Sequence, residues 1–199
     1  MLYLYDRSIV KDLERSFNPD NVADPVVKVV DPEGLLTLAA QIQDDSIKLP
    51  VVSVYRDPDT PIDPQRWNFA RAHRGVATVI DTETNQIYYE KALPIILSYK
   101  LTLLTYNSID MDELVREILF KYTTQYFLQF RAPYESDRII RFGVRIDPDQ
   151  EITRESGSFE YLSSGQLHQT IIPLKIDGAV LLTYTAAKLK RTEIDIKSS

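Results

Sequence analysis

The segment from residue 94 to residue 122 constrains the fold most, because a strand pattern in it is followed at once by a helix pattern. Apolar residues occupy every second position of its first part, namely Leu97, Tyr99, Leu101 and Leu103. Polar side chains lie between them. This period of two predicts a strand with one buried and one solvated face.

The second part of the segment repeats apolar side chains at steps of three and four. The apolar positions are Met111, Leu114, Val115, Ile118, Leu119 and Tyr122. Because these positions form one stripe on a helix, we predict an amphipathic helix that begins near residue 110. Asp110 or Ser108 can accept hydrogen bonds from the free N–H groups of its first turn.

Two further extended runs follow this helix. Residues 138–147 alternate in character and end at a turn made of aspartate and proline. Residues 167–176 form the second run, and Asp177-Gly178 predicts a hairpin into a last strand at residues 179–184. Strand patterns also cover residues 49–55, 76–80 and 86–90, the last two as a hairpin. We therefore predict an α+β fold, with a mixed, mainly antiparallel sheet packed against one or two amphipathic helices and with long loops.

Pro173 lies inside the run at residues 167–176. Proline has no N–H to donate to a ladder, so we predict that its strand lies at a sheet edge or carries a bulge. An exposed edge can pair with a neighbouring chain. Ile172 and Leu174 are therefore candidates for contact with a partner.

The first 45 residues predict an N-terminal helical extension. Asp6 can cap a helix with a stripe of Ile9, Val10, Leu13 and Phe17. Residues 26–30 are β-branched and predict an extended link, and Asp31-Pro32 predicts the start of a second helix. The predicted organisation is an extension at residues 1–45, an α+β domain at residues 46–187 and a C-terminal arm at residues 188–199.

A long loop from residue 56 to residue 75 is the first candidate for contact with another subunit. Prolines at its start prevent regular structure, and long ordered loops in compact domains are usually functional. The candidate contact residues are Trp67, Phe69, Arg71 and Arg74. The alternative is a polar loop anchored by an aromatic side chain.

Composition excludes several classes of protein. The formal net charge of −6 argues against a nucleic-acid-binding domain, which usually carries a basic surplus. The chain has no cysteine, which removes disulfides, thiol nucleophiles and thiolate metal sites. No apolar run approaches the roughly 20 residues needed to span a bilayer. Because Asp6 and Arg7 follow the first apolar residues at once, we expect no signal peptide, and expect a protein of the cytosol or of a particle assembled there.

Few residues suggest catalysis. The chain has two histidines, His73 and His168, and no nucleotide-binding or nucleophile motif. Three aspartate pairs are spaced by two, namely Asp57 with Asp59, Asp110 with Asp112, and Asp147 with Asp149. Two pairs enclose a proline and the third begins a helix, so turn and helix-end chemistry explains them. We expect no catalytic residue, no cofactor and no metal site, with a metal-dependent hydrolase using Asp110 and Asp112 as the alternative.

The second half of the chain resembles a known family. The resemblance rests on residues 93–103 (LPIILSYKLTL), 111–119 (MDELVREIL) and 169–176 (QTIIPLKI). This order of a proline-led strand, a helix and a late strand resembles the tail terminator and tail-completion proteins of tailed bacteriophages. The resemblance covers roughly residues 49–185, and its pattern is not a fixed motif.

The resemblance implies an α+β protomer that forms a ring, commonly a hexamer. Such a ring would cap the tail tube or sheath at its head-proximal end and join it to the neck or connector protein. DNA would only pass through its lumen, and the protein would be no enzyme and touch no membrane. It would be found in the virion, after assembly in the host cytoplasm. The alternative within this class is another neck, sheath-linked or baseplate component.

Overall fold

A computed structural model describes residues 2–17, 26–29, 48–59, 61–65, 77–81, 87–90, 92–124, 126–131, 138–157 and 167–181. Its helices are α1 (Leu2–Ser16) and α4 (Ser108–Tyr122). Its strands are β1 (Val26–Val29), β2 (Val51–Arg56), β3 (Ala77–Asp81), β4 (Ile87–Glu90), β5 (Ala92–Thr105), β6 (Tyr126–Arg131), β7 (Arg138–Ile146), β8 (Thr153–Gly157) and β9 (Leu167–Leu181).

The described strands form one sheet of order β1-β2-β5-β9-β7-β3-β4, in which β6 also pairs with β7 and β8 with β9. The pair β1–β2 is parallel, and every other described pair is antiparallel. The predicted α+β class, with a mixed and mainly antiparallel sheet packed against amphipathic helices, is confirmed.

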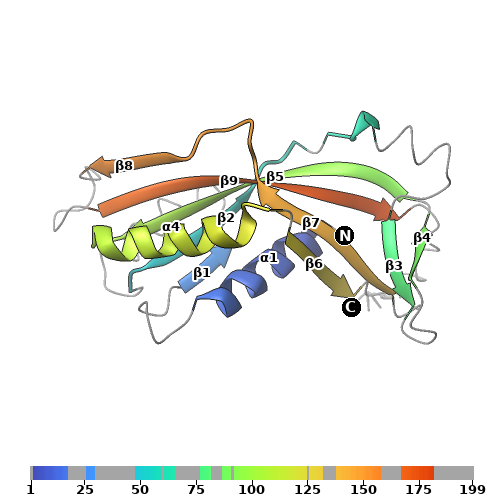
Figure 1. The fold of residues 1–199 in the computed structure, drawn as a ribbon, viewed down its shortest axis with the longest axis horizontal. Helices are drawn as coiled ribbons and strands as arrows, with labels where there is room; N and C mark the ends of the chain where they lie inside the picture. The colour runs from blue at the N-terminus through green and yellow to red at the C-terminus, as the bar shows by residue number, and fades with distance from the viewer. Residues whose placement is uncertain are drawn as a thin grey trace, which may run out of the picture.

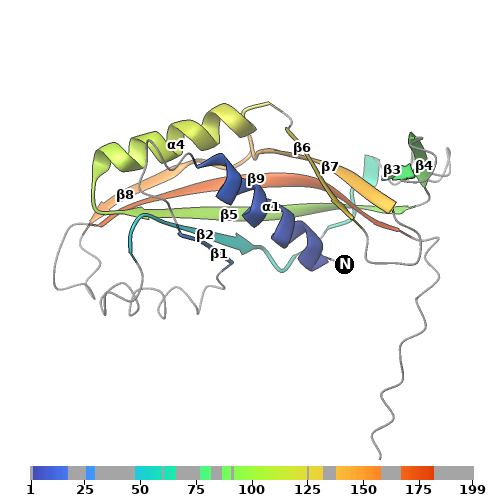
Figure 2. The ribbon, with the colours of Figure 1, turned by 90° about the horizontal axis from the view of Figure 1, so that it is seen from below.

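Both described helices pack on one face of the sheet and share one hydrophobic core with it. Helix α4 contacts the central strands β5, β9 and β7, whereas α1 contacts β1, β2 and β6. Figures 1 and 2 show α4 lengthwise along the sheet and α1 between β1 and β6. Since β1 and β6 are far apart in the strand order, the sheet curls around α1.

The long strands β5 and β9 form the centre of the sheet. They pair along the whole of β5, from Ala92 opposite Leu181 to Thr105 opposite His168. The predicted alternation of β5 is confirmed, because Leu97, Tyr99, Leu101 and Leu103 are buried in the core. Thr102 on the other face is also buried, so this end of β5 is covered on both sides.

Two predictions about β9 are wrong, namely the hairpin at Asp177-Gly178 and the sheet edge at Pro173. Asp177-Gly178 makes no hairpin, because β9 continues through both residues, which lie opposite Ile96 and Ile95 of β5. A Cβ atom at Gly178 would lie 3.1 Å from Cγ1 of Ile95, so glycine permits a close approach between the strands rather than a turn. The hairpin prediction was wrong because the local pair of residues is compatible with both arrangements.

The predicted edge is also wrong. Ile172 and Leu174 are fully buried, and β9 has β5 on one side and β7 and β8 on the other. Pro173 is tolerated in this central strand because it lies between the end of β7 pairing, at Leu174, and the start of β8 pairing, at Ile171. Its carbonyl oxygen accepts the N–H of Asp147 at 3.0 Å. Because neither β7 nor β8 has a residue paired with Pro173, the missing N–H leaves no hydrogen bond of these ladders unmade.

The N-terminal segment is part of the same core. Helix α1 begins at Leu2, before the predicted cap Asp6, and buries Leu4, Tyr5, Ile9 and Leu13. The predicted extended link is confirmed as β1, which pairs with β2. The boundary near residue 45 stays a prediction, although α1 and β1 pack as members of one core and one sheet.

Helix α4 follows its predicted stripe, with a correction at its start. Met111, Leu114, Ile118 and Tyr122 are buried. The cap is Asn107 rather than Ser108 or Asp110, because the Asn107 side chain accepts the N–H of Ile109 at 3.0 Å. Asparagine is among the best residues at this position.

The other strand predictions are confirmed as β2, β7 and the β3–β4 hairpin. The predicted second helix after residue 31 and the arm at residues 188–199 lie outside the described residues. Within the described ranges, no helix is both long and apolar enough to cross a membrane.

Candidate functional site

The structure describes two of the six predicted contact residues. Trp67, Phe69, Arg71 and Arg74 lie outside the described residues. Ile172 and Leu174 face α1 and α4 within the core, so they are not available to a partner.

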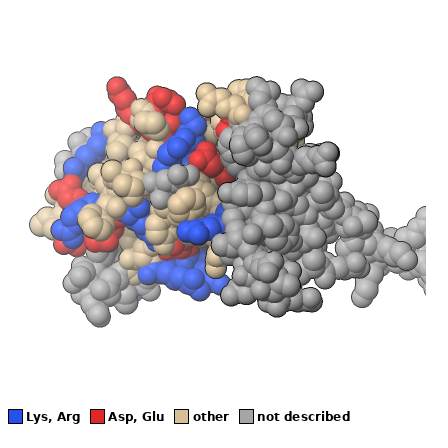
Figure 3. Space-filling model, turned by 45° about the vertical axis from the view of Figure 1, so that its right-hand side comes forward, with Lys and Arg blue, Asp and Glu red and all other residues tan. Residues whose placement is uncertain are grey.

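The aspartate pairs make structural contacts where they are described. Asp112 pairs with Arg154 at 2.7 Å, and Asp147 accepts the N–H of Asp149 at 3.2 Å. Nowhere in the described ranges do three His, Cys, Asp or Glu side chains group closely enough to hold a metal ion. Basic and acidic side chains are interspersed on the described part of the face in Figure 3.

Helix α1 is held to the sheet by the hydroxyl group of Tyr5. This hydroxyl donates to the Ala179 carbonyl and accepts the Ala179 N–H, each at 2.8 Å. Ala179 lies opposite Pro94 of β5, which has no N–H, and beyond the last residue that β9 pairs with β7. The Tyr5 side chain therefore takes the place of a strand at the point where β7 leaves β9.

A second tyrosine links α1 to β5. The Tyr99 hydroxyl donates to Asp6 Oδ1 at 2.6 Å, and Arg56 Nε lies 3.5 Å from the same oxygen. Burial, together with the hydrogen bond to the Asp6 carboxylate, raises the pKa of Tyr99 well above its usual range. The neutral hydroxyl is therefore the form that the fold stabilises.

A third tyrosine links α1 to α4. The Tyr122 hydroxyl donates to Asp12 Oδ2 at 2.5 Å, and Lys121 Nζ lies 2.8 Å from that oxygen. Lys121 also donates to the Ser16 hydroxyl. Burial and the Asp12 charge raise the pKa of Tyr122 well above its usual range. The Asp12 carboxylate is thus committed to a structural network.

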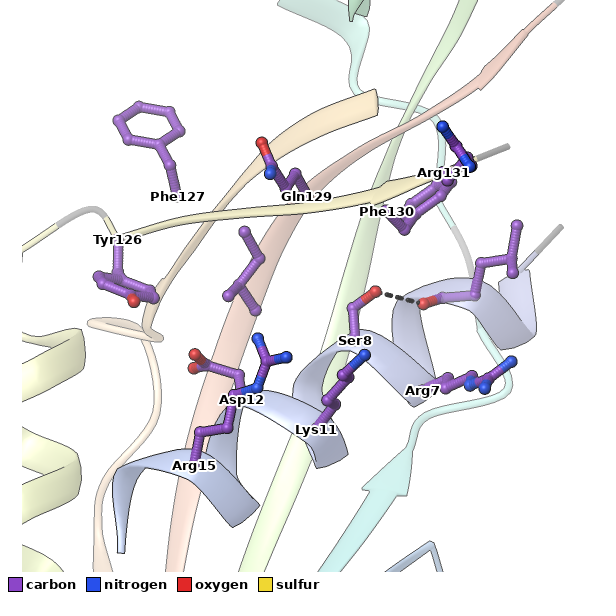
Figure 4. A pocket seen from close by; sticks show the side chains of 12 residues that line it. Arg7, Ser8, Lys11, Asp12, Arg15, Tyr126, Phe127, Gln129, Phe130 and Arg131 are labelled. Atoms are coloured by element: carbon purple, nitrogen blue, oxygen red, sulfur yellow. Dashed lines mark hydrogen bonds between the residues drawn. The ribbon is translucent and has the colours of Figure 1, made fainter. Parts of the chain in front are cut away.

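A groove of about 530 Å³ lies between α1 and β6. Figure 4 shows α1 below β6, with Arg15 and Asp12 near the Tyr126 end of the strand and Arg7 near the Arg131 end. The largely buried side chains of Leu4, Leu128 and Phe130 also line it. Its volume lies within the roughly 300–1,000 Å³ of ordinary ligand sites.

The α1 wall of this groove is basic. Arg7, Lys11 and Arg15 line it and are exposed to solvent. Among the described residues, no carboxylate lies within ion-pair distance of these three cations. None of them is a candidate in the sequence analysis, although their spacing of four places them on one helical stripe. The sequence alone does not show that β6 lies beside that stripe.

The outer face of α4 is apolar at two positions. Ile109 is 65% exposed and Phe120 is 88% exposed. They are eleven residues apart, which places them at nearly the same angle on the helix, with Arg116 between them. Tyr106, just before the helix, is 53% exposed. At a rise of 1.5 Å per residue, Ile109 and Phe120 lie about 16 Å apart, so α4 offers a partner two separate apolar side chains.

A scan of the chain against models of known protein families gives no match, and neither does a search among curated proteins.

Proposed function

We propose that the protein is a structural subunit of a bacteriophage tail, which forms a ring at the head-proximal end and joins the tail tube or sheath to the neck. The resemblance over residues 49–185 motivates this proposal. The α+β architecture agrees with the fold that the resemblance implies. The protein would then act by binding copies of itself and its neighbours in the particle.

One observation carries the proposal, namely the exposed apolar side chains of Ile109 and Phe120 on α4. Burying a large apolar side chain against a neighbouring copy stabilises a complex by about 1.5–3 kcal/mol. A closed ring needs heterologous contacts, in which these two side chains meet a different surface of the next copy.

Light scattering across a concentration series tests the proposal, with and without a tail tube or sheath subunit. We expect a single closed oligomer, formed by the protein alone or when the partner is added. Phe120→Gln should shift that oligomer toward monomer. A protein that stays monomeric at high concentration with either partner present would contradict the proposal.

The position in the particle has its own test. Antibody labelling of intact phage tails should place the protein at the junction with the head. Label at the baseplate would instead favour the alternative component named above.

A further inference from the structure

Strand β6 borders the groove with an edge that has no strand partner in the described residues. Its one strand neighbour there is β7, and α1 lies on the other side of the groove. Beyond the β6–β7 ladder, no backbone hydrogen bond between described residues involves Tyr126–Phe130. An edge of this kind presents a row of donors and acceptors to an extended chain.

The dimensions of the groove suit an added strand. The six residues of β6 span about 20 Å at the usual rise of a strand. Leu4, Leu128 and Phe130 are each 8–9% exposed and give the groove an apolar floor. A strand lying beside β6 would place alternate side chains on this floor and the others toward solvent.

The charge of the groove defines the chemistry of that strand. Arg7, Lys11 and Arg15 follow one another along α1 at steps of four. Like charges at this spacing destabilise a helix by a few tenths of a kcal/mol per pair. Asp12, the carboxylate in the same wall, is occupied by Tyr122 and Lys121. The three cations are therefore available to acidic side chains of a bound segment.

We propose that the groove between α1 and β6 binds an extended acidic segment of a second protein as an added strand beside β6. The bound segment would alternate apolar side chains, which face the floor, with acidic side chains, which pair with Arg7, Lys11 and Arg15. This proposal is independent of ring formation, because the groove belongs to a single protomer. A nucleic acid is disfavoured, since it would not pair with the strand edge.

The test measures binding of a labelled eight-residue peptide of alternating valine and glutamate by fluorescence anisotropy. We expect saturable binding that weakens as salt is raised. The matched peptide with lysine in place of glutamate should not bind. The acidic peptide methylated on alternate backbone nitrogens should bind at least tenfold more weakly, because it cannot complete a strand ladder.

Charge reversal locates the site. Lys11→Glu with Arg15→Glu should weaken binding by about tenfold, which corresponds to about 1.4 kcal/mol. The matched control is Lys48→Glu with Lys100→Glu, which reverses two exposed charges outside the groove and should leave binding unchanged.

Four outcomes of the binding experiments would overturn the proposal. They are no binding of the acidic peptide up to millimolar concentration, equal binding of the methylated peptide, an equal loss in the control variant, and displacement of the peptide by lower concentrations of single-stranded DNA. A change in oligomer mass caused by the groove reversal without peptide would assign the groove to contact between copies, and would also overturn it.

Discussion

The helices α1 and α4 lie on the same face of the sheet but are held there by different interactions. Helix α4 is held mainly by an apolar stripe, which includes Met111 and Leu114. Helix α1 buries apolar side chains too, and in addition is joined to its surroundings through Tyr5, Asp6 and Asp12. Apolar burial depends on area and is non-directional, whereas each hydrogen bond depends on one geometry. The position of α1 is therefore the more narrowly defined.

The two helices also expose different kinds of side chain to solvent. Helix α4 presents Ile109 and Phe120 to solvent, and α1 presents Arg7, Lys11 and Arg15. Exposed apolar side chains are suited to contact with a folded neighbour, while a row of cations beside a strand edge is suited to a charged extended chain. One protomer thus offers α4 to a neighbouring copy and the groove beside α1 to an acidic segment of a second protein.

We predict the largest loss of stability for a change in the buried apolar stripe of α4. Leu114→Ala removes a fully buried side chain from α4, and such changes cost about 2–5 kcal/mol of unfolding free energy. Urea denaturation measures the loss. Leu119→Ala makes the same chemical change at a partly exposed position of α4 and should cost less. Equal losses would mean that α4 does not pack through the Leu114 stripe.

The next effect tests the polar attachment of α1. Tyr5→Phe keeps the ring, which packs edge-on against Phe130 and Phe142, but removes the hydroxyl that serves both backbone groups of Ala179. Leaving a buried polar group unpaired costs about 1–3 kcal/mol, again measured by urea denaturation. Tyr3→Phe removes the same hydroxyl from an exposed position of α1 and should have no effect. A stable Tyr5→Phe protein would show that water or a rearranged strand replaces the hydroxyl.

The two tyrosines paired with aspartates predict how stability depends on pH. The pKa values of Tyr99 and Tyr122 are raised in the folded protein above the value of about 10 in an unfolded chain. Above pH 10 the unfolded chain therefore loses these protons first, so their contribution is complete below pH 10 and is lost as the pH rises. Each should contribute a slope of up to about 1.4 kcal/mol per pH unit.

Denaturation between pH 8 and pH 11 measures this slope. The double variant Tyr99→Phe with Tyr122→Phe should show a shallower loss than the natural chain, which separates the tyrosines from the titrating lysines. An unchanged slope would refute the assignment.

The smallest effect on stability is expected at the outer face of α4. Phe120→Gln replaces a side chain that is 88% exposed, so the free energy of unfolding should change by no more than about 0.5 kcal/mol. Thermal denaturation at low protein concentration measures this on dissociated protomers. A loss above about 1 kcal/mol would mean that Phe120 packs within the protomer and does not form a contact surface.

The sequence predicts best where the signal is local and periodic. The alternation around Leu101 and the helical stripe around Leu114 each define an element and its buried face, and both are confirmed. The cap at Asn107 was missed because several neighbouring residues have side chains able to cap a helix. The cap lies one residue before Ser108 and three before Asp110, and the helix itself is unchanged.

The sequence fails where the answer depends on which strands are neighbours. Pro173 indicates an edge by its own chemistry, yet it fits a central strand because β7 and β8 divide the adjacent side of β9 at that residue. The groove has the same limitation. The spacing of Lys11 and Arg15 is visible in the sequence, but their proximity to Leu128 and Phe130 arises only when distant segments pack.

The bond between Tyr5 and Ala179 also sets a requirement on folding during synthesis. The two residues are 174 positions apart in the chain. At 5–20 residues per second, a ribosome needs roughly 10–35 s to proceed from one to the other. Throughout that interval α1 lacks the β9 backbone to which it binds, and the apolar side chains that it will bury, such as Ile9 and Leu13, remain without their final neighbours. Helix α1 is therefore made well before it can reach its native place, and its apolar side chains are exposed to aggregation or to chaperones during that interval.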